Sequence, residues 1–271
     1  RLFSKLRTGG DVKMVALGSS FTSGHGCTES VHQFDNARKA CAWPARAQEG
    51  LSRLFPQSSI SLLNMARGGI GTKVILGAAA LLLREVPGGP GQIDLIMLDA
   101  TITDSYQQKN EVQLSLEALV RVLHKVAPQA VVVLVTDGQG RAIWIAEVYR
   151  SVASFYGLPV VDYAALVESA AKPDDLWYCS NNCDCPHPVW QTHQVLADVF
   201  VATLASGFRG LCAAASVPQP TFPAGTLASQ ELLDRVKTCM VGESEYYAPK
   251  QGGPQPTIVH GWRLFEDRPG K

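Results

Sequence analysis

Short apolar runs recur along the first two-thirds of the chain, and amphipathic or polar segments separate them. Each run is bounded by glycine or polar residues, which is typical of strands buried on both faces of a parallel sheet. The predicted strands are Val12–Leu17, Ser59–Met65, Ile93–Leu98, Ala130–Val135 and Pro159–Val161.

The segments between these runs carry apolar residues at helical spacing. The clearest is Glu111–Ala127, whose apolar side chains fall on one face of a helix. Thr72 is placed to cap a helix over Lys73–Val86, which the Pro-Gly-rich run after it ends. The other predicted helices are Trp43–Phe55, a helix through Ile145 and Phe155, and Val189–Leu204.

Strands that alternate with helices predict an α/β fold, here a three-layer sandwich around a five-stranded parallel sheet. This domain is expected to cover residues 1–206, with a polar loop between Cys27 and Cys41. Residues 207–271 differ, because they hold many prolines, one helical piece around Ser229–Cys239 and a possible strand Thr257–Phe265. We expect this part to be a C-terminal tail packed on the main domain.

The composition indicates a globular protein with a large core, since 46% of residues are hydrophobic and 18% are charged. Lys plus Arg equal Asp plus Glu at 24 each, so charge gives no argument for nucleic acid or an anionic membrane as partner. The longest apolar run, Val74–Leu83, is too short to span a bilayer, and no transmembrane segment is expected. Nothing in the sequence indicates an oligomeric state.

The chain holds seven cysteines, an odd number that is high for a cytosolic enzyme of this size. This count favours the secretory pathway or the extracellular space, with disulfides between some of them. Cys27–Cys41 and Cys212–Cys239 are plausible local bridges. Three more cysteines lie before the last helix and could imitate a zinc cluster with His187, but their spacing differs from the usual C-x₂-C pairs, so disulfides are favoured. They are Cys179, Cys183 and Cys185.

Candidate chemistry lies at the ends of two of these elements. Ser20 follows the first strand, where open α/β folds place their ligands. Asp184 precedes His187 by three residues, so its carboxylate can accept a hydrogen bond from Nδ1–H and orient the ring as a base for a serine hydroxyl. Each motif alone has an ordinary explanation, a serine-rich turn or solvated loop residues. Together they predict a Ser–His–Asp triad at one edge of the sheet.

The glycine-rich segment 68–73 precedes a helix and hints at a phosphate cradle, but it lacks the G-x-x-x-x-G-K-[ST] spacing. The same loop geometry serves equally well to bind an oxyanion. Two further histidines receive no catalytic role. His25 is interpreted as a loop residue near Ser20, and His193 as a structural hydrogen-bonding residue of the last helix.

Four blocks of the sequence, in this order and spacing, resemble the SGNH (GDSL-type) hydrolase family over about residues 11–206. The similarity is strongest to eukaryotic, notably algal, members with a cysteine-rich loop and a C-terminal extension. The resemblance implies Ser20 as nucleophile, His187 as base, Asp184 as its orienting carboxylate, and the N–H groups of Ser20 and Gly69 as an oxyanion hole. The blocks are Gly18–Gly24, Asn64–Thr72, Leu98–Asp104, and Asp184–Pro188 followed by Thr192 and His193.

Two positions depart from the family pattern. Ser19 stands where the first block usually has Asp. Thr103 stands where the third block has an Asn whose side chain donates to the oxyanion. Its hydroxyl can also donate, so Thr103 is the third expected member of the oxyanion hole, but with a shorter reach than an amide. Loss of one oxyanion donor costs about 10²–10³ in kcat in other enzymes.

The resemblance implies a serine esterase that hydrolyses or transfers small acyl groups through an acyl-enzyme, without cofactor or metal. Its substrates would be small-molecule or glycan esters, such as O-acetyl groups on glycans, or lipid esters. The alternative is a non-catalytic module of the same fold that binds a glycan or a protein, which the replacement of Asn by Thr103 favours.

Overall fold

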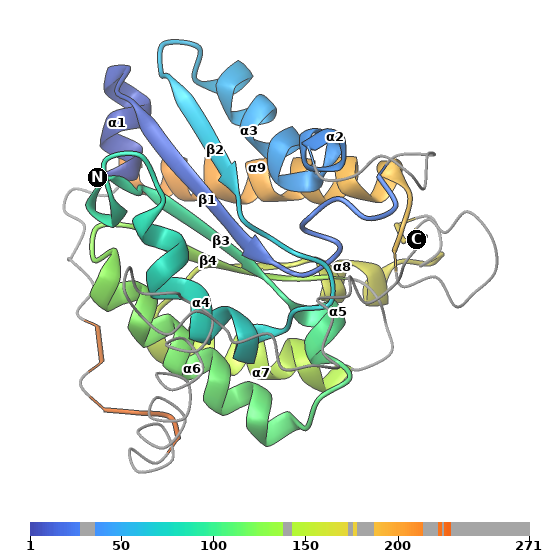
Figure 1. The fold of residues 1–271 in the computed structure, drawn as a ribbon. Helices are drawn as coiled ribbons and strands as arrows, with labels where there is room; N and C mark the ends of the chain where they lie inside the picture. The colour runs from blue at the N-terminus through green and yellow to red at the C-terminus, as the bar shows by residue number, and fades with distance from the viewer. Residues whose placement is uncertain are drawn as a thin grey trace, which may run out of the picture.

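The computed structural model describes residues 1–27, 36–137, 143–172, 176–177, 187–213, 222–223 and 225–228. A five-stranded sheet forms the centre, with strand order β2-β1-β3-β4-β5 and every pair parallel (Figure 1). The strands are β1 (Val12–Gly18), β2 (Ile60–Asn64), β3 (Leu95–Asp99), β4 (Val131–Thr136) and β5 (Val160–Asp162). All five predicted strands are therefore confirmed, each to within two residues at its ends.

Helices cover both faces of this sheet, which confirms the three-layer sandwich (Figure 1). The helices that the sequence predicted are present as α3 (Trp43–Leu54), α4 (Thr72–Arg84), α6 (Lys109–Val126), α7 (Ile143–Tyr156) and α9 (Trp190–Ala213). The last of them, α9, continues past its predicted end at Leu204 and past the predicted domain end at residue 206. The short helices that the sequence analysis did not predict are α1 (Leu2–Thr8), α2 (Asn36–Cys41), α5 (Thr101–Asp104), α8 (Tyr163–Ser169) and the 3₁₀ turn η1 (Pro90–Gln92). The helix α2 corrects the expectation that the chain between Cys27 and Cys41 is loop throughout.

Side chains along the central strands alternate between two apolar cores. Val15 and Leu17 of β1 pack in the core with α4, α6 and α7, whereas Met14 and Ala16 pack in the core with α1, α3 and α9. A strand with both faces buried needs apolar residues at nearly every position, which explains the almost continuous apolar runs of β1, β3 and β4. The sheet is therefore sandwiched along its whole middle.

The strand order has one reversal point, between β1 and β3. From β1 the chain moves to β2 on one side and then returns to β3 on the other. In doubly wound sheets, ligands bind outside the carboxyl ends of the strands at this point. The segment after β1, which contains Ser20, begins there.

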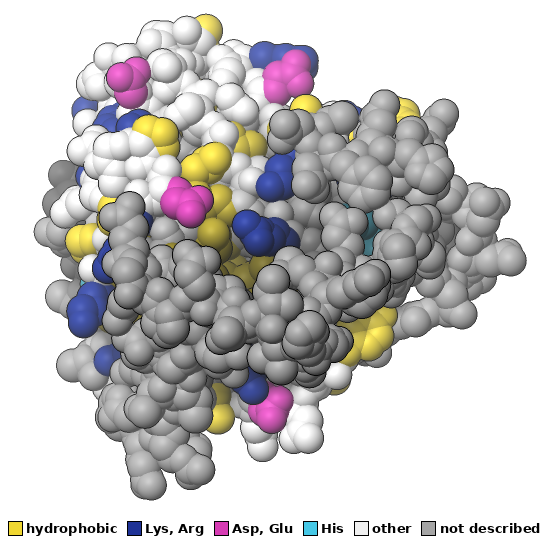
Figure 2. All heavy atoms as spheres, in the orientation of Figure 1, with side chains coloured by type: hydrophobic (Ala, Val, Ile, Leu, Met, Phe, Trp, Pro, Cys, Tyr) yellow, Lys and Arg dark blue, Asp and Glu magenta, His cyan; other side chains and the backbone are white. Residues whose placement is uncertain are grey.

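The surface shows no dominant sign of charge on the face in Figure 2, where the described basic and acidic side chains lie interspersed. This agrees with the equal numbers of acidic and basic residues. None of the helices in the described part of the chain is long and apolar enough to cross a membrane.

A short part of the C-terminal extension contacts α6. The Glu117 carboxylate is fully buried and accepts hydrogen bonds from Leu227 N at 2.7 Å and Ala228 N at 2.8 Å. It also accepts one from the Tyr156 hydroxyl at 2.6 Å, and Phe222 stacks on His124 with ring centroids 4.0 Å apart. Packing of the remaining extension on the main domain stays a prediction, since most of it lies outside the described residues.

Replacement of Glu117 by alanine is expected to lower the free energy of unfolding by about 2–4 kcal/mol, because it leaves two backbone N–H groups and a tyrosine hydroxyl without their charged acceptor. Urea unfolding measures this effect. Glu111→Ala, at an exposed position of the same helix, is the control and should change stability by about 0.5 kcal/mol or less. Equal midpoints for the two variants would contradict the role of Glu117.

Candidate active site

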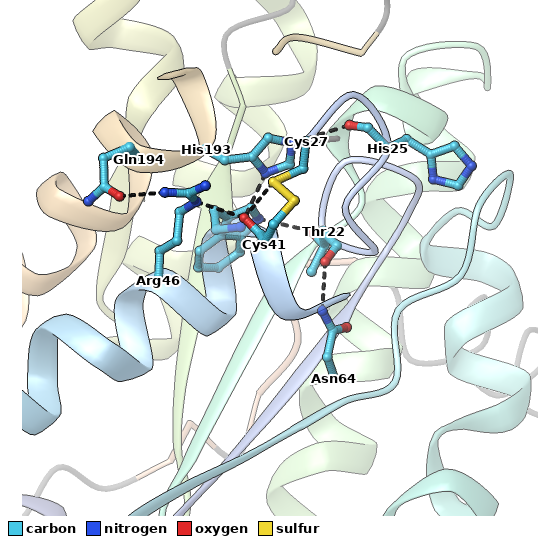
Figure 3. The surroundings of a disulfide bond; sticks show 9 residues. Thr22, His25, Cys27, Cys41, Arg46, Asn64, His193 and Gln194 are labelled. Atoms are coloured by element: carbon cyan, nitrogen blue, oxygen red, sulfur yellow. Dashed lines mark hydrogen bonds between the residues drawn. A yellow bond between two sulfur atoms is a disulfide. The ribbon is translucent and has the colours of Figure 1, made fainter. Parts of the chain in front are cut away.

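Ser20 lies in the turn that follows the central strand β1, and both neighbouring strands hold this turn. On one side, Ser19 N donates at 3.0 Å to the backbone oxygen of Asp99, the last residue of β3. On the other side, Asn64 at the end of β2 donates from Nδ2 to Thr22 O at 2.8 Å (Figure 3). The turn is thereby fixed at the carboxyl edge of the sheet, where Ser20 is only 6% exposed.

His187, which is 167 residues away in the sequence, lies beside this serine. His187 lies just before α9, and its Nε2 is 2.7 Å from Ser20 Oγ. A base must lie within about 2.6–3.2 Å of the proton-bearing atom to abstract its proton, and this pair meets that condition. The geometry is thus that of a serine beside a base, and the catalytic role of His187 stays a prediction.

The third member of the predicted triad, Asp184, lies outside the described residues, so its role in orienting His187 stays a prediction. The same holds for Cys179, Cys183 and Cys185 and for both alternatives that involve them, a zinc cluster or disulfides. The predicted Cys212–Cys239 bridge is likewise untested, because Cys239 and the side chain of Cys212 are outside this part of the chain.

The loop after β2 runs alongside the turn that carries Ser20. Met65 N donates to Ala16 O at 2.9 Å and Arg67 N to Gly18 O at 3.1 Å, which brings Gly69 to the same edge of the sheet. Gly69 has φ +75°, in the left-handed region that favours glycine, and no described residue other than its two chain neighbours comes within 4 Å of the place a Cβ would take. Open space at this glycine is compatible with a bound substrate oxygen.

Thr103 lies in α5, a single helical turn at the end of β3, and is half-buried. The next residue, Asp104, is buried and accepts hydrogen bonds from Thr72 N at 2.7 Å and from the Tyr149 hydroxyl at 2.9 Å. Burial raises the pKa of Asp104. The second and third sequence blocks are thus joined through one carboxylate.

This arrangement corrects the prediction that Thr72 caps α4. Gly71 is the N-cap residue, and Thr72 is the first residue of the helix. Its N–H and its hydroxyl both donate to the Asp104 carboxylate. A carboxylate from α5 therefore takes the place of a local cap and interacts favourably with the helix N-terminus. The same carboxylate occupies an N–H group that a phosphate cradle would need.

A second buried carboxylate lies against the turn that carries Ser20. Asp99 accepts hydrogen bonds from Thr22 Oγ1 at 2.7 Å and Thr101 Oγ1 at 3.0 Å, and Trp43 Nε1 donates to Thr22 Oγ1 at 3.3 Å. The pKa of Asp99 is raised to about 6, because the effect of burial outweighs that of the hydroxyl donors, which lower it. Sequence reasoning gave Asp99 no role, although a carboxylate directly after a buried apolar strand was the available signal.

A disulfide joins Cys27, just after the turn that carries Ser20, to Cys41 at the end of α2 (Figure 3). The structure thereby confirms the predicted Cys27–Cys41 bridge. Beside it, Arg46 donates to Cys41 O at 2.7 Å and to Gln194 Oε1 at 2.8 Å, which joins α3 to α9. The arginine thus connects the chain at the disulfide to the first turns of α9.

His193 of α9 is fully buried in the same region (Figure 3). Its Nδ1 accepts a hydrogen bond from Trp43 N at 3.1 Å, and its Nε2 donates to His25 O at 3.2 Å. A backbone N–H and a carbonyl fix the neutral tautomer with the proton on Nε2. Burial lowers the pKa of His193 to about 3. Its interpretation as a structural hydrogen-bonding residue agrees with these contacts.

Comparison with known proteins agrees with the resemblance seen in the sequence. Residues 16–195 match the GDSL-like Lipase/Acylhydrolase family. No curated protein matches the chain.

Among solved structures, a two-domain esterase active on acetylated mannans is similar with a TM-score of 0.63 and 16% identity, over 83% of this chain and 56% of that one. A mutant of Axe2, an acetyl-xylooligosaccharide esterase from Geobacillus Stearmophilus, gives a TM-score of 0.53 and 16% identity over 71% of this chain and 94% of that one. A lipase/acylhydrolase from Enterococcus faecalis gives 0.55 and 15%, over 72% and 96%. The chain thus spans little more than half the length of the mannan esterase, and at these identities the similarity shows the fold.

The family match covers all four sequence blocks, and the fold and the paired serine and histidine agree with it. The chain therefore belongs to the GDSL-like lipase/acylhydrolase family, whose members are SGNH-type serine ester hydrolases.

Proposed function

We propose that this protein is a serine esterase that removes small acyl groups through a covalent acyl-enzyme formed on Ser20. The observation that carries the proposal is the 2.7 Å contact between Ser20 Oγ and His187 Nε2 at the topological reversal point of the sheet. A serine hydroxyl is a weak nucleophile at neutral pH and needs such a base.

In acylation, Ser20 Oγ attacks the ester carbonyl carbon while His187 Nε2 takes the hydroxyl proton. The carbonyl oxygen becomes an oxyanion, which the N–H groups of Ser20 and Gly69 would stabilise with the Thr103 hydroxyl. The bond from carbon to the alcohol oxygen then breaks, and the imidazolium of His187 gives its proton to the leaving oxygen. Asp184 would hold the ring during both transfers.

In deacylation, a water molecule attacks the acyl carbon and His187 takes one of its protons. The ester bond to Ser20 then breaks, and the same proton returns to Ser20 Oγ. The products are the carboxylic acid and the free enzyme. An alcohol in place of water would give acyl transfer by the same steps.

We propose short acyl esters, in particular O-acetyl groups on glycans, as the substrates. The support is the fold that this chain shares with the acetylated-mannan esterase and the acetyl-xylooligosaccharide esterase. We also propose that the protein acts in the secretory pathway or outside the cell, because the Cys27–Cys41 disulfide persists in an oxidising compartment.

A panel of esters tests the proposal on the purified protein, from chromogenic acetyl esters and acetylated oligosaccharides to long-chain lipid esters. Release of acetate from the oligosaccharides, absent in Ser20→Ala, is the expected result. A preference for long chains would reject the acetyl assignment and keep the esterase. A folded protein inactive on every ester would favour the non-catalytic binding module instead.

Replacement of Thr103 by asparagine is expected to raise kcat on an acetyl ester by about tenfold or more, because the longer amide adds the donor that Thr103 supplies poorly; one oxyanion donor is worth about 10²–10³. Thr103→Val, which keeps the shape and removes the hydroxyl, should lower kcat with little change in KM. If kcat is the same for the wild type, Asn and Val proteins, Thr103 does not face the oxyanion.

A further inference from the structure

We infer that His25 is a positioning residue of this active site, one that holds the nucleophile turn, the Gly69 loop and the ring of His187 in a fixed mutual arrangement. The inference rests on the proposed esterase function. Three contacts of a single half-buried imidazole carry it, and each involves a different part of the site.

The first contact is with the backbone of the nucleophile itself. His25 Nδ1 lies 3.1 Å from Ser20 O and 3.0 Å from Ser23 Oγ, while Ser23 Oγ donates to Ser20 O at 2.9 Å. A carbonyl oxygen only accepts, and a bare Nδ1 would face it with a lone pair. We therefore assign the ring proton of neutral His25 to Nδ1, which donates to the Ser20 carbonyl.

The second contact is with the loop that carries Gly69. A Cβ at Gly68 would lie 3.0 Å from His25 Cε1 and 3.3 Å from His25 Nε2. The imidazole thus fills the space that a side chain at position 68 would take, and it packs directly on the backbone one residue before Gly69. In Figure 3 the ring points away from the disulfide and toward this loop. A shift of the ring would move the backbone that supplies an oxyanion donor.

The third contact is with the base. The rings of His25 and His187 have centroids 5.1 Å apart and are tilted by 32°. The next residue, Gly26, has φ +82°, and a Cβ there would lie 2.2 Å from Pro188 O. Residues 25–26 therefore pack against residues 187–188 in two ways, through the His25 ring on His187 and through the Gly26 backbone on Pro188.

The carbonyl of His25 completes the arrangement, since it accepts the hydrogen bond from His193 Nε2. His193 belongs to α9, the helix that His187 precedes. Ring and backbone of one residue thus connect the turn of the nucleophile to the helix beside the base. Misplacement of reacting groups by about 1 Å costs on the order of 10²-fold in rate, which sets the size of the effect expected from His25.

Two variants separate the hydrogen bond from the ring. His25→Phe keeps a ring against Gly68 and His187 but removes the Nδ1 donor. His25→Asn keeps an N–H donor near the position of Nδ1 but removes the ring. His124→Phe, at an exposed position of α6, is the matched control. For each protein, kcat and KM on a chromogenic acetyl ester and the thermal midpoint are measured.

We expect His25→Phe to lower kcat by about 10–100-fold with KM changed less than threefold, and His25→Asn to recover about tenfold of this loss. The thermal midpoints of both folded variants and the activity of His124→Phe should stay close to those of the wild type. Wild-type kcat in His25→Phe, or losses that follow the fraction of unfolded protein, would overturn the inference. An inactive wild-type protein would reject the proposed esterase and this inference with it, which is a different outcome from an active wild type with unaffected variants.

Discussion

Replacement of Ser20 by alanine is expected to lower kcat on an acetyl ester by about 10⁴-fold or more, and His187→Ala to lower it by a similar factor. The reason is that the two groups act as one unit, with Ser20 Oγ as nucleophile 2.7 Å from the Nε2 that takes its proton. The double variant should lose no more than either single one, because neither residue works without the other.

Steady-state kinetics on the three variants measure this, with thermal midpoints to show that each is folded. His124→Ala, on the exposed face of α6, is the matched histidine control and should keep full activity. If Ser20→Ala retains a tenth of the wild-type kcat, the nucleophile has been wrongly assigned. If the two single losses multiply in the double variant, the serine and the histidine do not act in the same step.

Acid should destabilise the protein through His193 by up to about 5 kcal/mol. Burial lowers the pKa of His193 from 6.5 to about 3, so the unfolded chain binds a proton over this range that the folded chain excludes. Protonation would also put an N–H at Nδ1, where Trp43 N already donates. The stability from neutral His193 is complete above pH 6.5 and is lost as the pH falls toward 3.

Urea unfolding between pH 7.5 and 3.5 tests this against His193→Gln, whose amide accepts and donates but does not ionise. The stability advantage of the wild type over this variant should shrink steadily as the pH falls below 6.5. His124→Gln, at an exposed position of α6 beside Phe222, is the matched histidine-to-glutamine control for this comparison. An advantage that stays constant with pH would show that His193 binds its proton equally in both states.

Continuous apolar runs made the sheet predictable. Ala130–Val135 and, apart from Lys13, Val12–Leu17 supply side chains to two cores at once, so nearly every position is apolar. The short length of each run and the turn residues around it favour a strand over a helix. Helices with a long amphipathic repeat, such as α6, were predicted for the same reason. The short helices α2 and α5 were not predicted. Helices of one or two turns are too short to show a helical repeat of apolar residues, and their stability comes from contacts with distant residues.

The site was predictable where a motif fixes a residue at a strand end, as for Ser20, or just before a helix, as for His187. It was not predictable where a partner is remote in sequence. Thr72 is a residue type that often caps helices, yet here Asp104 of α5 accepts the hydrogen bond from the Thr72 N–H at the start of α4. His25 is an ordinary loop histidine by sequence, and only the fold brings Gly68 and His187 to its ring. The glycines on either side of it were the available signal.

Covalent labelling of the intact protein tests the central claim most directly. A fluorophosphonate probe should add its mass to the peptide that contains Ser20 in the wild-type protein, should leave Ser20→Ala unmodified, and should react far more slowly with His187→Ala. A folded wild-type protein that the probe does not modify at Ser20 would contradict an activated serine at this position, and with it the esterase.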